Sequence, residues 1–140
     1  METKIINNPR IAVEMMQDRF KDIDHEELWG LFVGLRNEQI ACKLLSSGGW
    51  TSTTIDIRQI FSAALENKAV GIILFHNHLS ANPKPSISDL NVTDRIRAAA
   101  RILDIKLIDH IIIAGEQYYY YSFADEVIET IKTSRNESWR

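Results

Sequence analysis

The feature that most constrains the fold is an unbroken apolar run, Val70 to Phe75, which ends directly at His76 and His78. A short apolar run of this kind is typical of a buried β-strand. Side chains alternate along an extended chain, so two histidines separated by one residue point to the same side. The sequence therefore predicts a pair of imidazoles at the point where a buried strand ends.

A carboxylate follows these histidines at Asp89, after a loop rich in Asn, Pro and Ser that we expect over His76–Ser88. Ser88 is expected to cap a following helix, which would bring the carboxylate back to the imidazoles. Two His and one Asp leave a fourth zinc position open for water, which is typical of catalytic sites. A single zinc ion (Zn2+) is therefore predicted at His76, His78 and Asp89. The alternative for Asp89 is a carboxylate that only complements the helix dipole.

The rest of the chain alternates between helical and extended patterns. Helices are expected from Asn8-Pro9 through Phe20, over Asp56–Asn67, from Ser88 through Leu103 and over Ala124–Thr133. Strands are expected at Leu28–Leu35 and Ile40–Leu45 (a hairpin), Val70–Phe75, Lys106–Ala114 and Gln117–Phe123. This order predicts one mixed α/β domain.

Composition limits the classes of protein to which the chain can belong. At 140 residues, 45% of them hydrophobic, it is long enough for one domain with its own core. The single cysteine, Cys42, excludes an internal disulfide and a thiolate-rich zinc site. No apolar segment is long enough for a membrane span, and Met1–Lys4 lacks a signal-peptide pattern. We therefore expect a cytoplasmic protein with no membrane partner.

The charge balance argues against binding to nucleic acid through phosphate contacts alone. The chain has 16 Lys and Arg against 19 Asp and Glu, a net charge of -3. Sequence-independent DNA binding depends on clustered cations. Arg95, Arg97 and Arg101 lie on one expected helix and leave a local basic patch open, the alternative being a solvated helix face. DNA is thus a partner that the overall charge does not support.

The loop after the buried strand resembles the signature loop of the RadC family, bacterial members of the JAB1/MPN (JAMM) metallopeptidase-like superfamily. It reads HNHLSANPKPSISD from His76 to Asp89. Flanking segments at 67–75 and 107–113 agree, and the resemblance covers residues 26–123. It implies a single JAB1/MPN-like (cytidine-deaminase-like) α/β domain with a mixed β-sheet flanked by helices. Residues 1–25 would be an N-terminal helical extension and residues 26–140 the RadC-like JAB1/MPN domain.

The resemblance also implies a role for each site residue. His76, His78 and Asp89 match the three zinc ligands of the family. Ser86 matches a serine that helps to hold the oxyanion of a tetrahedral intermediate. Glu26 matches the acidic residue that contacts the zinc-bound water. The implied activity is that of a JAMM-type zinc hydrolase, cleaving an amide, isopeptide or peptide bond of an unknown protein or peptide substrate.

Alternatives stay open for two of these positions, and for one further pair of residues, when the residues are considered alone. Ser86 is compatible with a plain turn role. Glu27, or neither carboxylate, is the alternative to Glu26, because only one of two adjacent carboxylates can face the site. Asp109 and His110 also recur in the resemblance, but the apolar run around them favours a satisfied pair in the core.

Two departures from the family pattern bear on function. Leu79 and Ala81 stand where the family has the Pro and Gly of His-Asn-His-Pro-Ser-Gly, which affects the geometry of the loop more than its ligands. Full-length RadC proteins carry an N-terminal helix-hairpin-helix module, for which the residues before Glu26 are too few. We therefore expect a short form without that module.

Two functional classes follow. The first is the zinc-dependent hydrolase. The second is a non-catalytic or DNA-associated RadC-like module linked to DNA repair or mobile elements. A nuclease that needs the same ligands is a third outcome. The pattern does not indicate the substrate or the oligomeric state.

Overall fold

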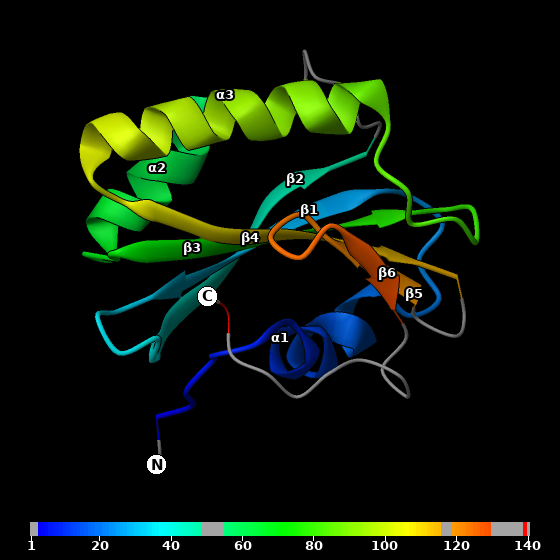
Figure 1. Cartoon of the computed structure of the whole chain (residues 1–140), viewed down its shortest axis with the longest axis horizontal. Helices are drawn as coiled ribbons and strands as arrows, with labels where there is room; N and C mark the ends of the chain where they lie inside the picture. Colours follow the sequence, from blue (N-terminus) through cyan, green and yellow to red (C-terminus); the bar gives the residue numbers. More distant parts are fainter. Residues whose placement is uncertain (1–2, 49–54, 116–118, 130–138, 140) are drawn as a thin grey trace.

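The computed structural model describes residues 3–48, 55–115, 119–129 and 139. Its helices are α1 (Pro9–Met16), α2 (Ile57–Glu66) and α3 (Ile87–Leu103), with a 3-10 helix at Gln17–Phe20. Its strands are β1 (Glu27–Val33), β2 (Gln39–Ser47), β3 (Gly71–His78), β4 (Lys106–Ala114), β5 (Tyr119–Ser122) and β6 (Val127–Glu129). These described residues form three layers, with α2 and α3 on one face of the sheet and α1 on the other (Figure 1). The predicted α/β class is confirmed.

The sheet has six strands in the order β2-β1-β3-β4-β5-β6. Strands β3 and β4 are parallel, and every other neighbouring pair is antiparallel. A parallel pair needs a crossover connection, which α3 provides. The chain therefore leaves the carboxyl end of β3 and immediately enters the loop that leads to the start of α3. This topology brings the end of β3 and the first turn of α3 together.

Alternation along β3 divides the core into two clusters. Ile72 and Leu74 pack in the cluster beneath α2 and α3, whereas Ile73 and Phe75 pack in the cluster against α1. His76 continues the first series, so its side chain lies on the α3 face of the sheet. Both faces of β3 are buried, as is typical of a strand with helices on both sides.

Strand β3 is longer than the sequence prediction. The predicted strand ended at Phe75 and placed His76 in a loop, but the observed strand runs to His78. The reason is that this segment pairs with β4 up to the last residue, where His78 lies beside Ala114. The two histidines are therefore held by a central strand, which fixes their backbone more firmly than a loop would.

The N-cap of helix α3 lies two residues before the predicted one. Ser86, and not Ser88, is its N-cap residue. The Oγ of Ser86 accepts a hydrogen bond from the backbone N–H of Asp89, and the Asp89 carboxylate accepts one from the N–H of Ser86. This reciprocal capping box needs an acidic or amide side chain three residues after the cap, which Ser86 has in Asp89. Asp89 is thereby fixed in the first turn.

The C-terminal helix predicted over Ala124–Thr133 is wrong for the residues that the structure describes. The chain turns after Ser122 and forms β6, whose Val127 pairs with Ser122 of β5. Pairing there satisfies the backbone of β5, which would otherwise be exposed along an edge. Residues 130–133 lie outside the described part of the chain.

The helix predicted through Phe20 is divided, because α1 ends at Met16 and a 3-10 helix follows it. The described ends of the other elements lie within two residues of their predicted ends. Asn8 caps α1, its Oδ1 accepting from the N–H of Ile11, and Pro9 occupies the first turn as expected. The β1–β2 hairpin and α2 are confirmed. In the tyrosine run, Tyr119 is exposed and Tyr120 is buried, in line with a strand. None of the described helices is long and apolar enough to cross a membrane.

Candidate metal centre

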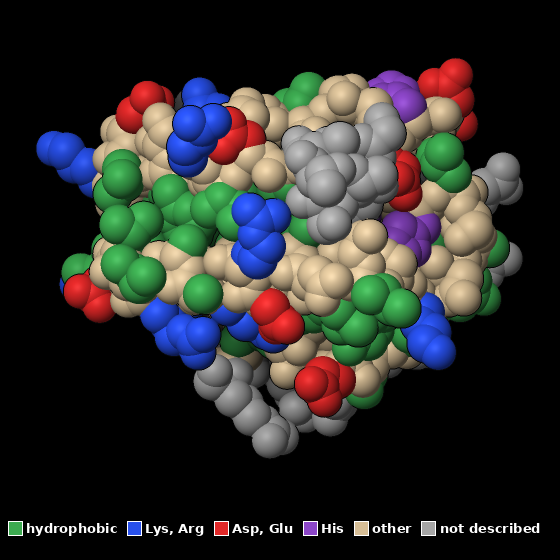
Figure 2. Space-filling model, turned by 90° about the horizontal axis from the view of Figure 1, so that it is seen from above, with side chains coloured by type: hydrophobic (Ala, Val, Ile, Leu, Met, Phe, Trp, Pro, Cys, Tyr) green, Lys and Arg blue, Asp and Glu red, His purple; other side chains and the backbone are tan. Residues whose placement is uncertain are grey.

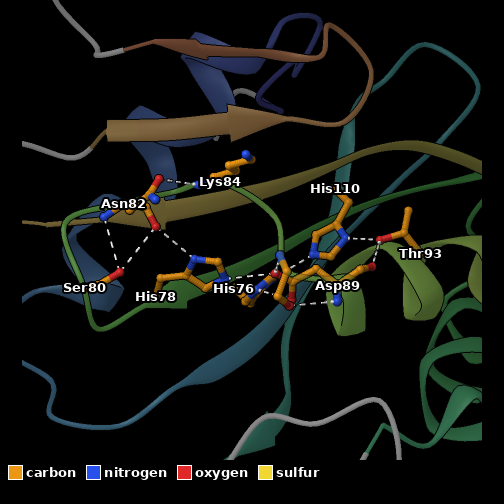
Figure 3. Close-up of polar contacts among 9 residues, drawn as sticks. His76, His78, Ser80, Asn82, Lys84, Asp89, Thr93 and His110 are labelled. Atoms are coloured by element: carbon orange, nitrogen blue, oxygen red, sulfur yellow. Dashed lines mark hydrogen bonds and ion pairs between the residues drawn. The ribbon is translucent and has the colours of Figure 1, made fainter.

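Three potential metal ligands meet at the carboxyl end of β3. His76 and His78 project from this strand on the α3 face, and Asp89 projects toward them from the first turn of α3 (Figure 3). One donor atom from each side chain can be chosen so that all three lie within 4.8 Å of one another. The structure therefore brings together the residues that the sequence predicted as zinc ligands.

The carboxylate of Asp89 lies between the two imidazoles. Its Oδ1 is 3.0 Å from Nε2 of His76, and its Oδ2 is 3.0 Å from Nε2 of His78. The side chains of His76 and Asp89 are fully buried, whereas that of His78 is 15% exposed. The centre is thus closed toward the core and reaches solvent on the side of His78.

The electrostatics keep the carboxylate ionised. Burial alone would raise the pKa of Asp89, but its contacts with both imidazoles and the hydrogen bond from the N–H of Ser86 hold it well below its usual range. Burial lowers the pKa of His76. Burial also acts to lower the pKa of His78, yet contacts with Asp89 and the carbonyl of Asn82 outweigh it and raise the pKa. An ionised carboxylate beside imidazole nitrogens is a donor set that fits a divalent cation.

Each histidine is also held through its second ring nitrogen. Nδ1 of His78 lies 3.0 Å from the backbone oxygen of Asn82, so it donates to that carbonyl. Nδ1 of His76 lies 2.7 Å from Nε2 of His110, which in turn contacts the hydroxyl of Thr93. In both rings Nδ1 is occupied away from Asp89, which leaves Nε2 as the nitrogen that faces the centre.

Asp109 and His110 are both buried, as expected, but their side chains do not pair with each other. Strand β4 sets Asp109 beside Ile73 and His110 beside Leu74, so the two side chains lie on opposite faces of the sheet. The carboxylate of Asp109 accepts from the backbone N–H of His110 and not from its imidazole. The imidazole of His110 instead belongs to the surroundings of His76.

The two candidate acidic residues lie on different faces. Leu28 of β1 is paired with His76, and Glu26 lies two residues before Leu28, immediately before the start of β1. Glu26 is half-buried, and its negative charge contributes to the raised pKa of His78. Glu27 turns the other way, where its carboxylate accepts from the indole N–H of Trp29. Glu26 thus lies close enough to His78 to affect its pKa, and its role at the centre stays a prediction.

Ser86 lies at the solvent-exposed start of α3, beside Asp89. Its Oγ is the acceptor for the N–H of Asp89 at 3.1 Å. A serine hydroxyl carries one proton and two lone pairs, so this cap does not use its proton. The structure therefore gives Ser86 a structural role and leaves its O–H as a donor close to the centre.

A cavity of about 410 Å³ adjoins His78 on the α1 side of the sheet end. Its walls come from the 3-10 helix and the segment after it, from the end of β3 and from the start of the loop that follows. The lining residues are Phe20, Lys21, Asp22, Ile23, Asn77, His78, Leu79, Ile113 and Gly115. The sequence does not indicate this pocket, because its segments are far apart along the chain and meet only in the folded domain.

Comparison with known proteins agrees with this geometry. The family model described as RadC-like JAB domain matches residues 6–128. This chain belongs to the RadC-like JAB domain family. A UPF0758 protein from Flavobacterium johnsoniae is 41% identical over 128 residues, covering 91% of this chain and 55% of that protein. A UPF0758 protein from Porphyromonas gingivalis is 38% identical over 121 residues, covering 86% and 53%. The chain thus spans about half the length of these curated relatives.

Hydrogen bonds hold the loop between β3 and α3 of this RadC-like domain, which departs from the family pattern at Leu79 and Ala81. Asn82 organises it, since its backbone oxygen accepts from His78 and its side-chain Oδ1 accepts from the N–H of Lys84 at 3.0 Å (Figure 3). Leu79 is exposed and contributes to the wall of the cavity. The contacts of Asn82 were not predicted from the sequence, because they depend on the path of the loop backbone.

Proposed function

We propose that this RadC-like chain is a zinc-dependent hydrolase of the JAMM type that cleaves an amide, isopeptide or peptide bond. The observation that carries the proposal is the convergence of His76, His78 and Asp89, with donor atoms within 4.8 Å, in a RadC-like JAB domain. Two imidazole nitrogens and one carboxylate oxygen suit zinc and leave a ligand position for water.

Each side chain of the centre has a separate role in the proposed reaction. His76, His78 and Asp89 would hold one zinc ion, which activates water as a Lewis acid and lowers its pKa to about 7 in such sites. Glu26 accepts a proton from the attacking water and returns it to the leaving nitrogen. Ser86 donates its hydroxyl proton toward the carbonyl oxygen as negative charge develops there.

The cavity beside His78 is the place where this proposal seats part of a protein or peptide substrate. Phe20, Ile23 and Leu79 offer apolar surface, and Lys21 with Asp22 adds polar groups at its rim. A site with apolar walls and few polar groups is typical of a pocket that accepts a side chain. The substrate would thus reach the centre from its solvent-exposed side.

A DNA-associated module receives less support. Helix α3 carries the arginines of the suspected basic patch, but Arg97 lies 3.7 Å from the carboxylate of Asp94 and its guanidinium lies over the ring of Phe123. Figure 2 shows Lys and Arg side chains scattered among acidic and apolar ones over the described part of this face. Binding through phosphate contacts favours clustered cations.

The first experiment measures metal content. The protein purified without added metal, and then loaded with zinc, is expected to hold one zinc per chain, and His78→Ala is expected to hold far less. A wild-type protein that stays free of metal after loading would contradict the proposal.

The second experiment measures hydrolysis with a matched pair of variants. Zinc-loaded protein is assayed on fluorogenic peptides, on an isopeptide-linked substrate and on DNA. Glu26→Gln is expected to keep its zinc and lose hydrolysis by about 100- to 10,000-fold. Glu27→Gln, which alters the neighbouring carboxylate on the other face, is expected to retain activity. DNA cleavage that needs the same ligands would instead favour a nuclease.

A further inference from the structure

A chain of buried polar side chains continues behind His76. Nδ1 of His76 lies 2.7 Å from Nε2 of His110, and Nδ1 of His110 lies 2.7 Å from Oγ1 of Thr93. Thr93 Oγ1 lies 2.7 Å from the backbone oxygen of Asp89. Because Asp89 Oδ1 contacts Nε2 of His76, the four residues form a closed ring from β3, β4 and α3 (Figure 3). All four are fully buried.

The directions of these hydrogen bonds can be assigned from the chemistry of one group. The backbone oxygen of Asp89 can only accept, so the single hydroxyl proton of Thr93 is donated to it. The oxygen of Thr93 must then accept from Nδ1 of His110. A neutral imidazole has a single ring proton, which His110 places on Nδ1, so its Nε2 is the acceptor in the contact with His76. It follows that His76 donates from Nδ1.

This assignment determines the state of Nε2, the other ring nitrogen of His76. With its ring proton on Nδ1, Nε2 presents a lone pair toward Oδ1 of Asp89 at a distance of 3.0 Å. Two groups that face each other with lone pairs need a positive charge shared between them, which a metal ion supplies. We infer that Thr93 and His110 are positioning residues that hold His76 in the tautomer and orientation in which Nε2 binds the metal. This inference rests on the proposed metal centre.

The two ligand histidines are held in different ways. For His78 the partner of Nδ1 is a backbone carbonyl, that of Asn82, which a substitution does not remove. For His76 the partner is a side chain, and a second side chain orients it. Partners of this kind change metal affinity by about 10- to 100-fold when they are lost. The contribution to His76 can therefore be measured by mutation.

Thr93→Val tests the inference, because valine keeps the shape of threonine and removes the hydroxyl. The zinc dissociation constant is measured on the full chain by competition with a chromophoric chelator. We expect Thr93→Val to weaken zinc binding by about 10- to 100-fold and Thr93→Ser, which keeps the hydroxyl, to restore most of it. Ser122→Ala is the matched control, since Ser122 is a buried hydroxyl that bonds to Asp109 and not to the ring.

The tautomer itself is read from the zinc-loaded wild type by long-range 1H–15N correlation spectra of the histidines. We expect a protonated Nδ1 and a metal-bound Nε2 on His76, and mixed states of His76 in Thr93→Val. The spectrum of the wild type tests the tautomer by itself, so this test remains valid even if Thr93→Val folds poorly.

The possible results separate this inference from the proposed function. If the wild type and Thr93→Val bind zinc with equal affinity and give the same spectra, the positioning role is overturned and the hydrolase proposal stands. An unprotonated Nδ1 on zinc-bound His76 also overturns the positioning role and leaves the hydrolase proposal standing. A wild type that binds no zinc overturns both.

Discussion

The indole N–H of Trp139 donates a hydrogen bond over 2.9 Å to Oδ2 of Asp109, in the middle of the sheet. The same carboxylate accepts from the hydroxyl of Ser122 and from the backbone N–H groups of His110 and Ala124. A buried carboxylate is tolerated only where such donors replace water. Asp109 therefore joins the C-terminal part of the described chain to β4 and β5.

Replacing the indole tests this connection. Trp139→Phe is expected to lower the free energy of unfolding by about 1.5 to 3 kcal/mol, because it removes a hydrogen bond to a buried charged acceptor. Urea unfolding followed by circular dichroism measures the loss. The effect should shrink in an Asp109→Asn background, and a loss of equal size in both backgrounds would assign it to packing alone.

Asp109 also predicts a pH dependence. Burial raises the pKa of this carboxyl from 3.8 to about 6, although its hydrogen-bond donors act in the opposite direction. The folded protein then holds the proton more tightly than the unfolded chain does. The stabilising contribution is therefore full below the unfolded pKa and is lost as the pH rises through about 6.

The measurement is a difference between two proteins, because the lowered pKa of Asp89 gives the opposite trend in the total. From pH 4 to pH 7, the stability of the wild type relative to Asp109→Asn is expected to fall by roughly 2 to 3 kcal/mol. A difference that stays constant over this range would contradict a raised pKa for Asp109.

Metal binding is expected to stabilise the fold. Ligands that bind only the native state add about 2.7 kcal/mol when their free concentration is 100 times the dissociation constant. The midpoint temperature of thermal unfolding should rise when zinc is added and return to its original value when a chelator removes the zinc. His78→Ala should show little shift, and a shift equal to that of the wild type would place the zinc elsewhere.

The start of α3 offers a test of the capping box. Ser86→Ala removes the acceptor for the N–H of Asp89 and is expected to cost about 1 kcal/mol of stability. Ser88→Ala changes the same residue type two positions later, inside the helix, and is expected to stay within about 0.5 kcal/mol. Equal losses would show that the capping geometry does not carry the effect.

The ligand set was predictable because each part of it is local. Alternation along a strand puts His76 and His78 on one side, and a short loop followed by a helix returns Asp89 to them. The same periodic patterns predicted most of the helices and strands. The errors at Ser88 and at the end of β3 concern where an element begins or ends, which depends on capping and on strand pairing.

The orientation of His110 was not predictable, because it depends on one irregularity between β3 and β4. Ile72 pairs with Leu107, but Ile73 pairs with Asp109, so Ile108 is an extra residue in β4. A shift of one residue exchanges the faces of all the side chains that follow. In a regular register Asp109 would lie on the face of His76, and the polar ring could not form. The strand propensities of the residues do not predict where such a bulge forms.

The uneven burial of the two histidines has a kinetic consequence. His76 and Asp89 are fully buried, so among the described residues an ion in the proposed centre would pass His78 and the short segment after it. Asn82 fastens that surface segment to the ring of His78. We therefore expect loss of this contact to speed the exchange of the ion while the sheet stays intact.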